Sequence, residues 1–565
     1  MKSIFKRLSL LAVPFMVIGC TPKEGSVTPS IEPSSSSPAE SSSSKETSVP
    51  ASSSSTISSS ALPQYEAKLP QIRFTFSKTD PNANFATVAT KSDLTRPEVD
   101  GKISITNVGD SYAKTDVPCT FKVRGNQTAN WSKKAFRIKL SNKANLLGLN
   151  GGKKFKKWVL LADAKDTTLI RSAAGFYLAR SVIQEGDKVW SSDYTPVTVY
   201  LNDEYWGMYY LAEQKEVKDG RVQLEEAEGN TSIEIGYCFE LDHYADSAGS
   251  PDEASEIRKG AEGDPTFRMK YAPEMVQGRP SGPLATGQVN TYTMLSDISD
   301  GPTNEHVQAD YTNVQNNGQL SQNSVKTSNS AQLSFIRARM EASYTVLYQA
   351  AMKNKAYEIN DQNEAVISTK SVQEVMNQHF NLNAWADGYI INGFSVPPDL
   401  GYSSFYMSYD NTPTGDHKLR YDVPWDFDSN FGNRNNFYVN ADGDEYVNNT
   451  YNTWLFLLSK LSFFKDIVKT KWNKLRDDKV FEGMFDMMKT FWKDNDGEIR
   501  KNHEKWPQND AAHQPPNNFD EIRNPYKDPA QYKEAEAETL SWCVKRVNYL
   551  EKQWGKNRAN ITASL

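Results

Sequence analysis

Apolar and polar residues alternate with period two along the first part of the folded region. Residues 71–76 show this alternation, which predicts half-buried strands, and similar short runs recur as far as residue 210. The fully apolar run 158–162 predicts a buried strand. Between the strands, residues 166–181 place apolar side chains on one helical face, and Asp166 can cap the start of that helix. This part therefore predicts a sheet with one inserted helix.

The second part of the chain changes to helical spacing. From Ser334 onward, residues 337–353 and 372–394 carry periodic apolar positions, and helical patterns dominate again over 452–565. Residues 410–436 return to strand and loop character between these stretches. A sheet-rich N-lobe followed by a helix-rich C-lobe predicts an α+β, two-lobed fold with an active site in the cleft between the lobes.

Residues 245 to about 330 interrupt this pattern. They are rich in Gly, Pro, Ser, Asn, Asp and Gln and have few apolar residues at regular spacing. We expect them to form a long polar insertion on the surface of the folded domain.

The N-terminal region predicts a membrane-anchored protein. Residues 1–19 combine a basic start with an apolar stretch that is too short to cross a bilayer but suits a signal peptide. Small residues lead directly into Cys20, a pattern that resembles a bacterial lipobox with Cys20 as the lipidated residue. Residues 20–63 are dominated by Ser and are expected to be a disordered tether, which leaves 64–565 as the folded domain. The predicted location is the cell envelope, outside the cytoplasm, with membrane contact through the lipid anchor only.

Composition excludes several classes of partner and site. The chain has 64 basic and 70 acidic residues, a net charge of -6, so no nucleic-acid partner is expected. Beyond Cys20, the cysteines Cys119, Cys238 and Cys543 are widely spaced and odd in number. They predict no disulfide framework and no zinc site, and we expect buried, mostly free thiols.

Acidic residues in two segments are candidates for chemistry. Asp426 and Asp428 alternate with large aromatic residues, and in a strand this period would place both carboxylates on one face. Two adjacent carboxylates repel unless a cation lies between them, and oxygen ligands favour magnesium, manganese or calcium. The alternatives are the acid pair of a glycoside hydrolase or a purely structural turn. Asp399 follows two prolines in a stiff loop and is either a general base or a turn-forming residue.

Basic residues gather in the first part of the chain. Arg124, Gly125 and Asn126 precede the lysine-rich strand 133–139, and a glycine turn flanked by cations suits phosphate oxygens, although a solvated strand face has the same composition. Arg171 lies on a largely apolar helix, so it either pairs with a carboxylate or extends to the surface.

Taken together, these segments resemble the CotH kinase-like family, which is named for a spore-coat protein. The matching segments follow one another in register over roughly residues 100 to 555: 124–139, 160–171, 199–213, 236–242, 399–406, 425–432 and 454–472. The resemblance implies a two-lobed protein-kinase-like fold and an atypical kinase outside the cytoplasm. Such an enzyme would transfer phosphate from ATP to Ser or Thr of surface or envelope proteins, with Mg²⁺ or Mn²⁺.

The resemblance also implies roles for individual residues. Lys134 would bind the nucleotide phosphates, with Lys139 as the alternative and Arg124 assisting. Glu213 and Gln214 end a hairpin strand where a kinase has its interlobe hinge, so they would meet the adenine.

In the second part of the chain, the same resemblance makes Asp399 the base that orients the acceptor hydroxyl. Asp426, together with Asp428, would hold the metal.

The chain also departs from kinase patterns. It has no Gly-x-Gly-x-x-Gly loop and no His-Arg-Asp motif, and it has Ser403-Ser404 where some family members have His-Asn. The alternative function is therefore a catalytically inactive kinase-like module that binds a surface protein or a polysaccharide.

Overall fold

In the computed structural model, all of the described residues lie in one compact unit, Ser60–Leu565. The structure describes residues 69–79, 97–125, 127–227, 229–241, 331–400, 404–433, 440–442, 452–507 and 531–565, with the strand backbones 266–269 and 290–294. The predicted signal peptide, Cys20 and the Ser-rich tether lie outside the described residues. These domain boundaries therefore stay predictions.

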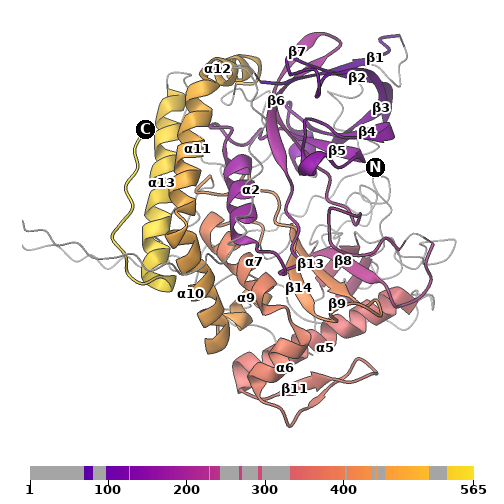
Figure 1. Ribbon diagram of the computed structural model, residues 1–565, viewed down its shortest axis with the longest axis vertical. Coiled ribbons are helices and arrows are strands. Elements are labelled where there is room, and N and C mark those ends of the chain that lie inside the picture. Colours follow the sequence, from indigo (N-terminus) through magenta and orange to yellow (C-terminus); the bar gives the residue numbers. More distant parts are fainter. Residues whose placement is uncertain are drawn as a thin grey trace, which may run out of the picture. The chain divides into compact units, whose positions relative to one another are not determined.

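The first part of the described chain forms a closed barrel (Figure 1). Its strands are β1 (Gln71–Phe76), β2 (Val99–Thr106), β3 (Lys114–Arg124), β4 (Ala135–Ala144), β5 (Phe155–Leu161), β6 (Tyr194–Leu201) and β7 (Glu204–Glu213). The order around the barrel is β1-β2-β3-β4-β5-β7-β6, and the parallel pairing of β1 with β6 closes it. Alternate side chains, such as Ile72 and Phe74 on β1, fill the interior. The predicted strands are confirmed, whereas their closure into a barrel was not predicted.

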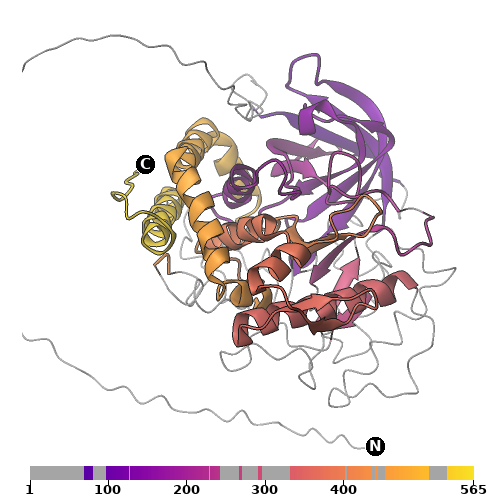
Figure 2. The same ribbon diagram turned by 60° about the horizontal axis from the view of Figure 1, so that its bottom comes forward.

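Helix α2 (Arg171–Val182) is the predicted inserted helix, between β5 and β6. It contacts α7 (Leu382–Ser395) and α11 (Val480–Asp494) in the helical part of the chain (Figures 1 and 2). It is buried on nearly every side: Arg171 and Ser172 are buried together with its apolar residues, and only Arg180 is exposed. The helix begins five residues after Asp166, whose carboxylate accepts hydrogen bonds from the N–H groups of Ile170 and Arg171 at 2.9 and 2.8 Å.

Helices dominate the second part, as predicted. Besides α7 and α11 they are α5 (Ala331–Lys353), α6 (Val372–His379), α9 (Thr453–Leu458), α10 (Ser462–Asp477), α12 (Asp496–Lys505) and α13 (Tyr532–Trp554). The single helical stretch expected over 372–394 is two helices, α6 and α7. The break occurs because Phe380 forms a β-bridge with Leu419 and Asn381 caps the next helix, accepting from the Ala384 N–H at 3.2 Å.

A second, antiparallel sheet belongs to the second part. It contains β8 (Gly236–Leu241), β9 (Thr266–Met269), β10 (Asn290–Met294), β13 (Phe405–Asp410) and β14 (Leu419–Asp422), in the order β14-β13-β8-β10-β9. Strands β9 and β10 come from the predicted insertion, so part of it extends this sheet, and the rest of it lies outside the described residues. A short hairpin of β11 (Tyr357–Ile359) and β12 (Ala365–Ile367) completes the strands in this part.

These elements confirm a mixed α+β fold with a sheet-rich first part and a helical second part. The kinase-like two-lobed arrangement stays a prediction. Cys119, Cys238 and Cys543 are buried free thiols, as expected. No helix in the described ranges has the length and apolar character needed to span a membrane.

Helix α12 joins the helical part to the barrel. The Met208 N–H of β7 donates to Asn502 Oδ1 at 3.1 Å, and the Trp206 and Trp506 rings meet edge-on at 5.0 Å between centroids. His503 is buried in this contact, and its Nε2 donates to the Thr167 carbonyl at 2.9 Å. Its Nδ1 has no hydrogen-bond partner among the described residues, so a charged ring would bury an unpaired N–H.

The fold predicts an acid-sensitive contact at His503. Burial, with a further contribution from Lys133, lowers the pKa of His503 to about 4. The imidazole of His503 therefore binds a proton near pH 6.5 in the unfolded chain but only near pH 4 in the folded chain. The free energy of unfolding falls as the pH drops from about 6.5 to about 4, by roughly 3 kcal/mol at most for this group. Urea unfolding of the wild type and His503→Gln from pH 7 to 4.5 should show a flatter pH dependence in the variant. If the free energies of unfolding of the two proteins depend on pH in the same way, the prediction is wrong. The pKa of His379 is also lowered to about 4, but both proteins contain His379, so its contribution cancels when they are compared at each pH.

Candidate active site

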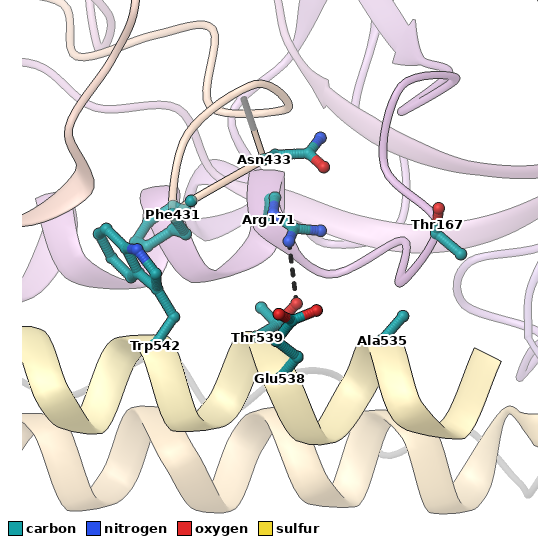
Figure 3. Close-up of a pocket in the computed structure, with 9 residues that line it drawn as sticks. Thr167, Arg171, Phe431, Asn433, Ala535, Glu538, Thr539 and Trp542 are labelled. Carbon is teal, nitrogen blue, oxygen red and sulfur yellow. Dashed lines mark hydrogen bonds between the residues drawn. The ribbon is translucent and has the colours of Figure 1, made fainter. Parts of the chain in front are cut away.

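A buried ion pair connects the parts of the candidate site. Asp166, between β5 and α2, is fully buried and pairs with Arg171. The Arg171 guanidinium also donates through Nε to the Asn430 carbonyl at 3.1 Å and through Nη2 to Thr539 Oγ1 of α13 at 2.9 Å (Figure 3). Of the two alternatives for Arg171, pairing with a carboxylate is therefore the one found.

The guanidinium of Arg171 also lines a pocket of about 340 Å³ (Figure 3). The other lining residues come from the loop before α2, the segment after Asp428 and helix α13: Thr167, Phe431, Gly432, Asn433, Ala535, Glu538, Thr539 and Trp542. The guanidinium donates to Asp166, to the Asn430 carbonyl and to Thr539. At this pocket it therefore holds together the loop before α2, the segment after Asp428 and helix α13.

Residues 423–433, here called the acidic segment, carry the predicted metal ligands. The prediction of a period-two strand is wrong, because residues 423–427 form no strand and Val423 and Asp426 have left-handed backbones with φ of 49° and 65°. Aspartate is among the residues that tolerate this conformation best. The aromatic residues are nevertheless anchored as expected: Trp425 and Phe427 are buried and pack edge-on against Phe176 of α2, with ring centroids 5.5 and 5.4 Å away.

Gly175 of α2 makes room for this anchor. A Cβ at this position would lie 2.0 Å from Cγ of Phe427 and 2.4 Å from its Cδ2. No real Cβ makes such a contact, so any larger residue here would push Phe427, and the carboxylates on either side of it, out of position.

The acidic segment and the barrel together line a pocket of about 450 Å³ that is partly open to solvent. Its lining comes from the end of β3, the β4 and β5 strands, α2 and the acidic segment: Arg124, Thr128, Ala135, Leu161, Ala162, Asp163, Ala164, Ser172, Phe176, Trp425, Asp426, Phe427 and Asp428. Among the predicted site residues, it brings together Arg124, Asp426 and Asp428.

The pocket has three carboxylates in contrasting environments. Asp426 is exposed at the rim, whereas Asp428 and Asp163 are buried. Burial raises the pKa of Asp428 to about 6, and the negative charge of Asp426 adds to this while Lys165 opposes it. Burial also raises the pKa of Asp163 to about 8, and the charges of Asp428 and Asp166 act in the same direction. The folded pocket therefore disfavours its own negative charges unless a cation joins them.

Hydrogen bonds orient the rim carboxylate. Ser404 Oγ donates to Asp426 Oδ2 at 3.0 Å, and the Ser404 N–H donates to Glu240 Oε1 at 3.2 Å. Lys215 forms an ion pair with Glu240 at 3.1 Å. Thus Ser404, one of the two serines that depart from the His-Asn of some family members, fixes the position of Asp426.

The remaining predicted nucleotide-binding residues do not line this pocket. Lys134 is buried, and its ammonium donates to the Ala129 and Trp131 carbonyls at 2.5 and 2.8 Å. Lys139 is exposed on β4. Their roles toward a nucleotide stay predictions.

Glu213 and Asp399 also lie apart from the pocket lining. The Glu213 carboxylate is buried, accepting from Asn150 Nδ2 at 2.6 Å and pairing with Arg221 at 3.3 Å. Asp399 is half-buried in the turn that follows α7, and residues 401–403 next to it lie outside the described residues. The adenine and base assignments are therefore still predictions.

The sequence analysis overlooked the residues just after β5. Asp163 lines the pocket, and Lys165 donates to Ser429 Oγ of the acidic segment at 3.2 Å. Their surroundings include Lys133, from the predicted lysine-rich strand, which is buried, donates to the Ala162 and Met208 carbonyls at 2.6 Å each, and has its pKa lowered to about 7 by burial. These residues could have been predicted from the sequence, because charged residues alternate directly after the fully apolar strand 158–162. Side chains at the end of a buried strand lie at one edge of the barrel, where functional residues are common.

Comparison with known proteins finds a family match on the barrel side of the pocket. Residues 121–265 match the family described as CotH kinase protein. The resemblance inferred from the motifs is confirmed over this segment, which contains Arg124 and Asp163 of the pocket lining, whereas the acidic segment lies beyond it. No curated protein matches the chain.

The packing of Gly175 against Phe427 predicts a strong effect of a single methyl group. Gly175→Ala should destabilise the protein by about 1–3 kcal/mol or more through overpacking, and should also impair any function of the acidic segment. Chemical unfolding measures the first effect, and ligand-induced changes in melting temperature measure the second. The matched control is Gly497→Ala on α12, where a Cβ meets nothing within 4 Å and stability should be unchanged or rise by up to about 1 kcal/mol. Equal behaviour of the two variants would refute the packing argument.

Proposed function

We propose that this chain is an extracytoplasmic CotH-like atypical kinase that transfers phosphate from ATP to Ser or Thr of surface or envelope proteins, with Mg²⁺ or Mn²⁺. The observation that supports it best is the shared pocket, in which the CotH kinase segment contributes Arg124 and the acidic segment contributes Asp426 and Asp428. The family description is consistent with a kinase-like function. The acceptor, the metal and the location are part of the proposal.

The residues of the pocket fit a divalent cation. Asp426 and Asp428 line the pocket together with the buried Asp163, whose Oδ2 lacks a hydrogen-bond partner among the described residues. Among the described residues, no cluster of three or more His, Cys, Asp or Glu residues has the arrangement of a metal site. That does not argue against magnesium, because magnesium in kinases is held by one or two carboxylates together with substrate phosphates and water.

In the proposed reaction, phosphoryl transfer mainly requires positioning and charge neutralisation. Asp426 and Asp428 would hold the metal ion, which supplies positive charge beside the phosphates. Arg124, which lines the same pocket and lies over the Trp425 ring at 5.6 Å, can donate to phosphate oxygens. Asp399 would accept the proton of the acceptor hydroxyl, and Ser404 keeps Asp426 in place.

One observation favours the alternative of an inactive binding module. The ammonium of Lys134, the predicted phosphate ligand, is already engaged by two backbone carbonyls. We favour the kinase because the pocket keeps two buried carboxylates, Asp163 and Asp428, whose charges repel each other, and a bound metal ion would offset this repulsion.

Nucleotide binding and phosphate transfer test the proposal. ATP with Mg²⁺ or Mn²⁺ should raise the melting temperature of the wild type, and Asp426→Asn should lose most of this rise because a metal ligand is removed. Asp399→Asn should retain the rise but lose about 100-fold or more of the transfer of labelled phosphate, since it removes the base. Asp442→Asn, at an exposed aspartate away from the pocket lining, serves as the control. Transfer that survives both substitutions would reject the residue roles, and the absence of any effect of ATP and metal would reject the kinase.

Location can be tested separately. We propose that Cys20 is acylated and anchors the protein on the outer side of the membrane. Cys20→Ser should move the protein from the membrane fraction to the soluble extracytoplasmic fraction without changing the folded domain, as followed by fractionation and labelling with palmitate. Unchanged membrane association of the variant would contradict the anchor.

A further inference from the structure

The part of the barrel that adjoins the pocket is strongly basic. Residues 101–162 contain 13 Lys and Arg residues, two Asp and no Glu, although the whole chain has a net charge of -6. The reaction proposed above gives a role to Arg124 but leaves most of these cations unexplained. A concentration of one charge on one side of a protein attracts partners of the opposite charge.

Three neighbouring strands of the barrel reach the pocket. Arg124 of β3, Ala135 of β4 and Leu161 of β5 all line it, and β4 pairs with both β3 and β5 (Figure 1). On these strands the side chains at alternate positions point to the outside of the barrel, whereas those between them, such as Phe121 and Phe136, are buried in its core. The outward side chains therefore form a surface that begins at the pocket.

Four cations on this surface form two rows. Lys122 of β3 lies directly opposite Arg137 of β4 in the first row, and Lys139 of β4 lies directly opposite Lys157 of β5 in the second. Lys139 is exposed, and the other three are half-buried. At about 3.3 Å per residue, the rows lie roughly 7 and 13 Å from the strand residues that line the pocket. These four residues are called the basic face.

The cations of the basic face act together on a carboxylate. Glu98, just before β2, pairs with Arg137 and accepts a hydrogen bond from Thr120 Oγ1 at 3.3 Å. Partial burial raises the pKa of Glu98, but the positive charges of Arg137, Lys139 and Lys122 outweigh this and lower the pKa below its usual value. The basic face is thus arranged to stabilise negative charge.

The basic face keeps an excess of positive charge. Like charges directly opposite each other on neighbouring strands destabilise a sheet. Glu98 and Asp100, which lies opposite Thr120 on β2, place two negative charges beside the four cations. An extended peptide also rises about 3.3 Å per residue, so a peptide whose Ser or Thr enters the pocket would place its residues two and four positions away beside the two rows.

We propose that the basic face binds the acceptor, and that the acceptor is an acidic protein segment with Asp or Glu about two to five residues from the Ser or Thr that receives the phosphate. This inference rests on the proposed function and adds its substrate class. It also gives Lys139, the alternative nucleotide ligand of the sequence analysis, a role in acceptor binding. A protein segment is favoured over anionic lipid because the basic face is continuous with the pocket that an acceptor hydroxyl has to enter.

Binding of labelled peptides to the full chain tests the basic face without requiring catalysis. The probes are short peptides with one Ser and with either Glu or Gln two and four residues away on both sides, and fluorescence anisotropy measures their binding. The wild type should bind the Glu peptide about 10-fold or more tightly than the Gln peptide, and about 1 M salt should remove most of this preference. Lys122→Gln and Lys139→Gln should each reduce the preference several-fold.

Glu98→Gln should have the opposite effect. Arg137 then loses its carboxylate partner and can pair with the peptide, so the Glu peptide should bind several-fold more tightly than it does to the wild type. Damage to the fold would not produce such a gain. Lys469→Gln, at an exposed lysine of α10, is the matched control and should bind like the wild type.

Three results would overturn the inference. They are equal binding of the Glu and Gln peptides by the wild type, an unchanged preference in both lysine variants, and weaker binding of the Glu peptide by Glu98→Gln. Vesicles of phosphatidylglycerol test the lipid alternative. If they bind through Lys122 and Lys139 while the Glu peptide does not, the basic face is a membrane contact and the inference is wrong.

Phosphate transfer separates the basic face from the kinase. An active kinase should show a lower KM for the Glu peptide than for the Gln peptide at a similar kcat, because the basic face holds the acceptor away from the reacting atoms. Binding that depends on Lys122 and Lys139, without any phosphate transfer, supports the basic face and rejects the kinase. Phosphate transfer with equal KM for the two peptides rejects the basic face and leaves the kinase intact.

Discussion

The buried pair of Asp166 and Arg171 is the interaction on which the site depends. Asp166 organises the first turn of α2 through backbone N–H groups, and Arg171 reaches from that turn to the acidic segment and to α13. Both side chains are buried, so losing either would leave an uncompensated charge, at a cost of about 3–5 kcal/mol. One ion pair therefore connects three segments, around residues 166–171, 430 and 539, that lie far apart in the sequence.

In the pocket, by contrast, the carboxylates repel one another. Asp163, Asp426 and Asp428 are brought to one space while burial and mutual repulsion favour their neutral forms. The aromatic anchors Trp425 and Phe427, seated against α2, hold the acidic segment in spite of this. A fold that keeps such an arrangement has a stability cost that ligand binding would offset, as is common at functional sites.

The site is built from both parts of the chain. The segment that matches the CotH kinase family supplies Arg124, Asp163 and α2 to the pocket, and the acidic segment follows only after β14. Ser404 connects the two through Glu240 of β8, which itself pairs with Lys215 just after the barrel. The chemistry that we propose therefore depends on how well the barrel and the helical part are held together, and α12 and Arg171 both contribute to that.

The sequence by itself determined the strands, the helices and the residue types available for chemistry. Periods of 2 and 3.6 report which side of an element is buried, and this was enough for the barrel strands, α2 and most later helices. It was also enough to identify Asp426 and Asp428, because charges between large aromatic residues are conspicuous in any fold.

Only the tertiary structure decided which residues contact the buried side of each strand and helix. The pairing of β1 with β6, the carbonyl partners of Lys134 and the left-handed backbone at Asp426 all depend on contacts between distant residues. Asp163 is the clearest case: in the sequence it is one charge among several after a strand, and only the fold buries it beside Asp428 with one oxygen unpaired. The physical reason is that local periodicity records burial but not the identity of the neighbour, and the chemistry of a site depends on its neighbours.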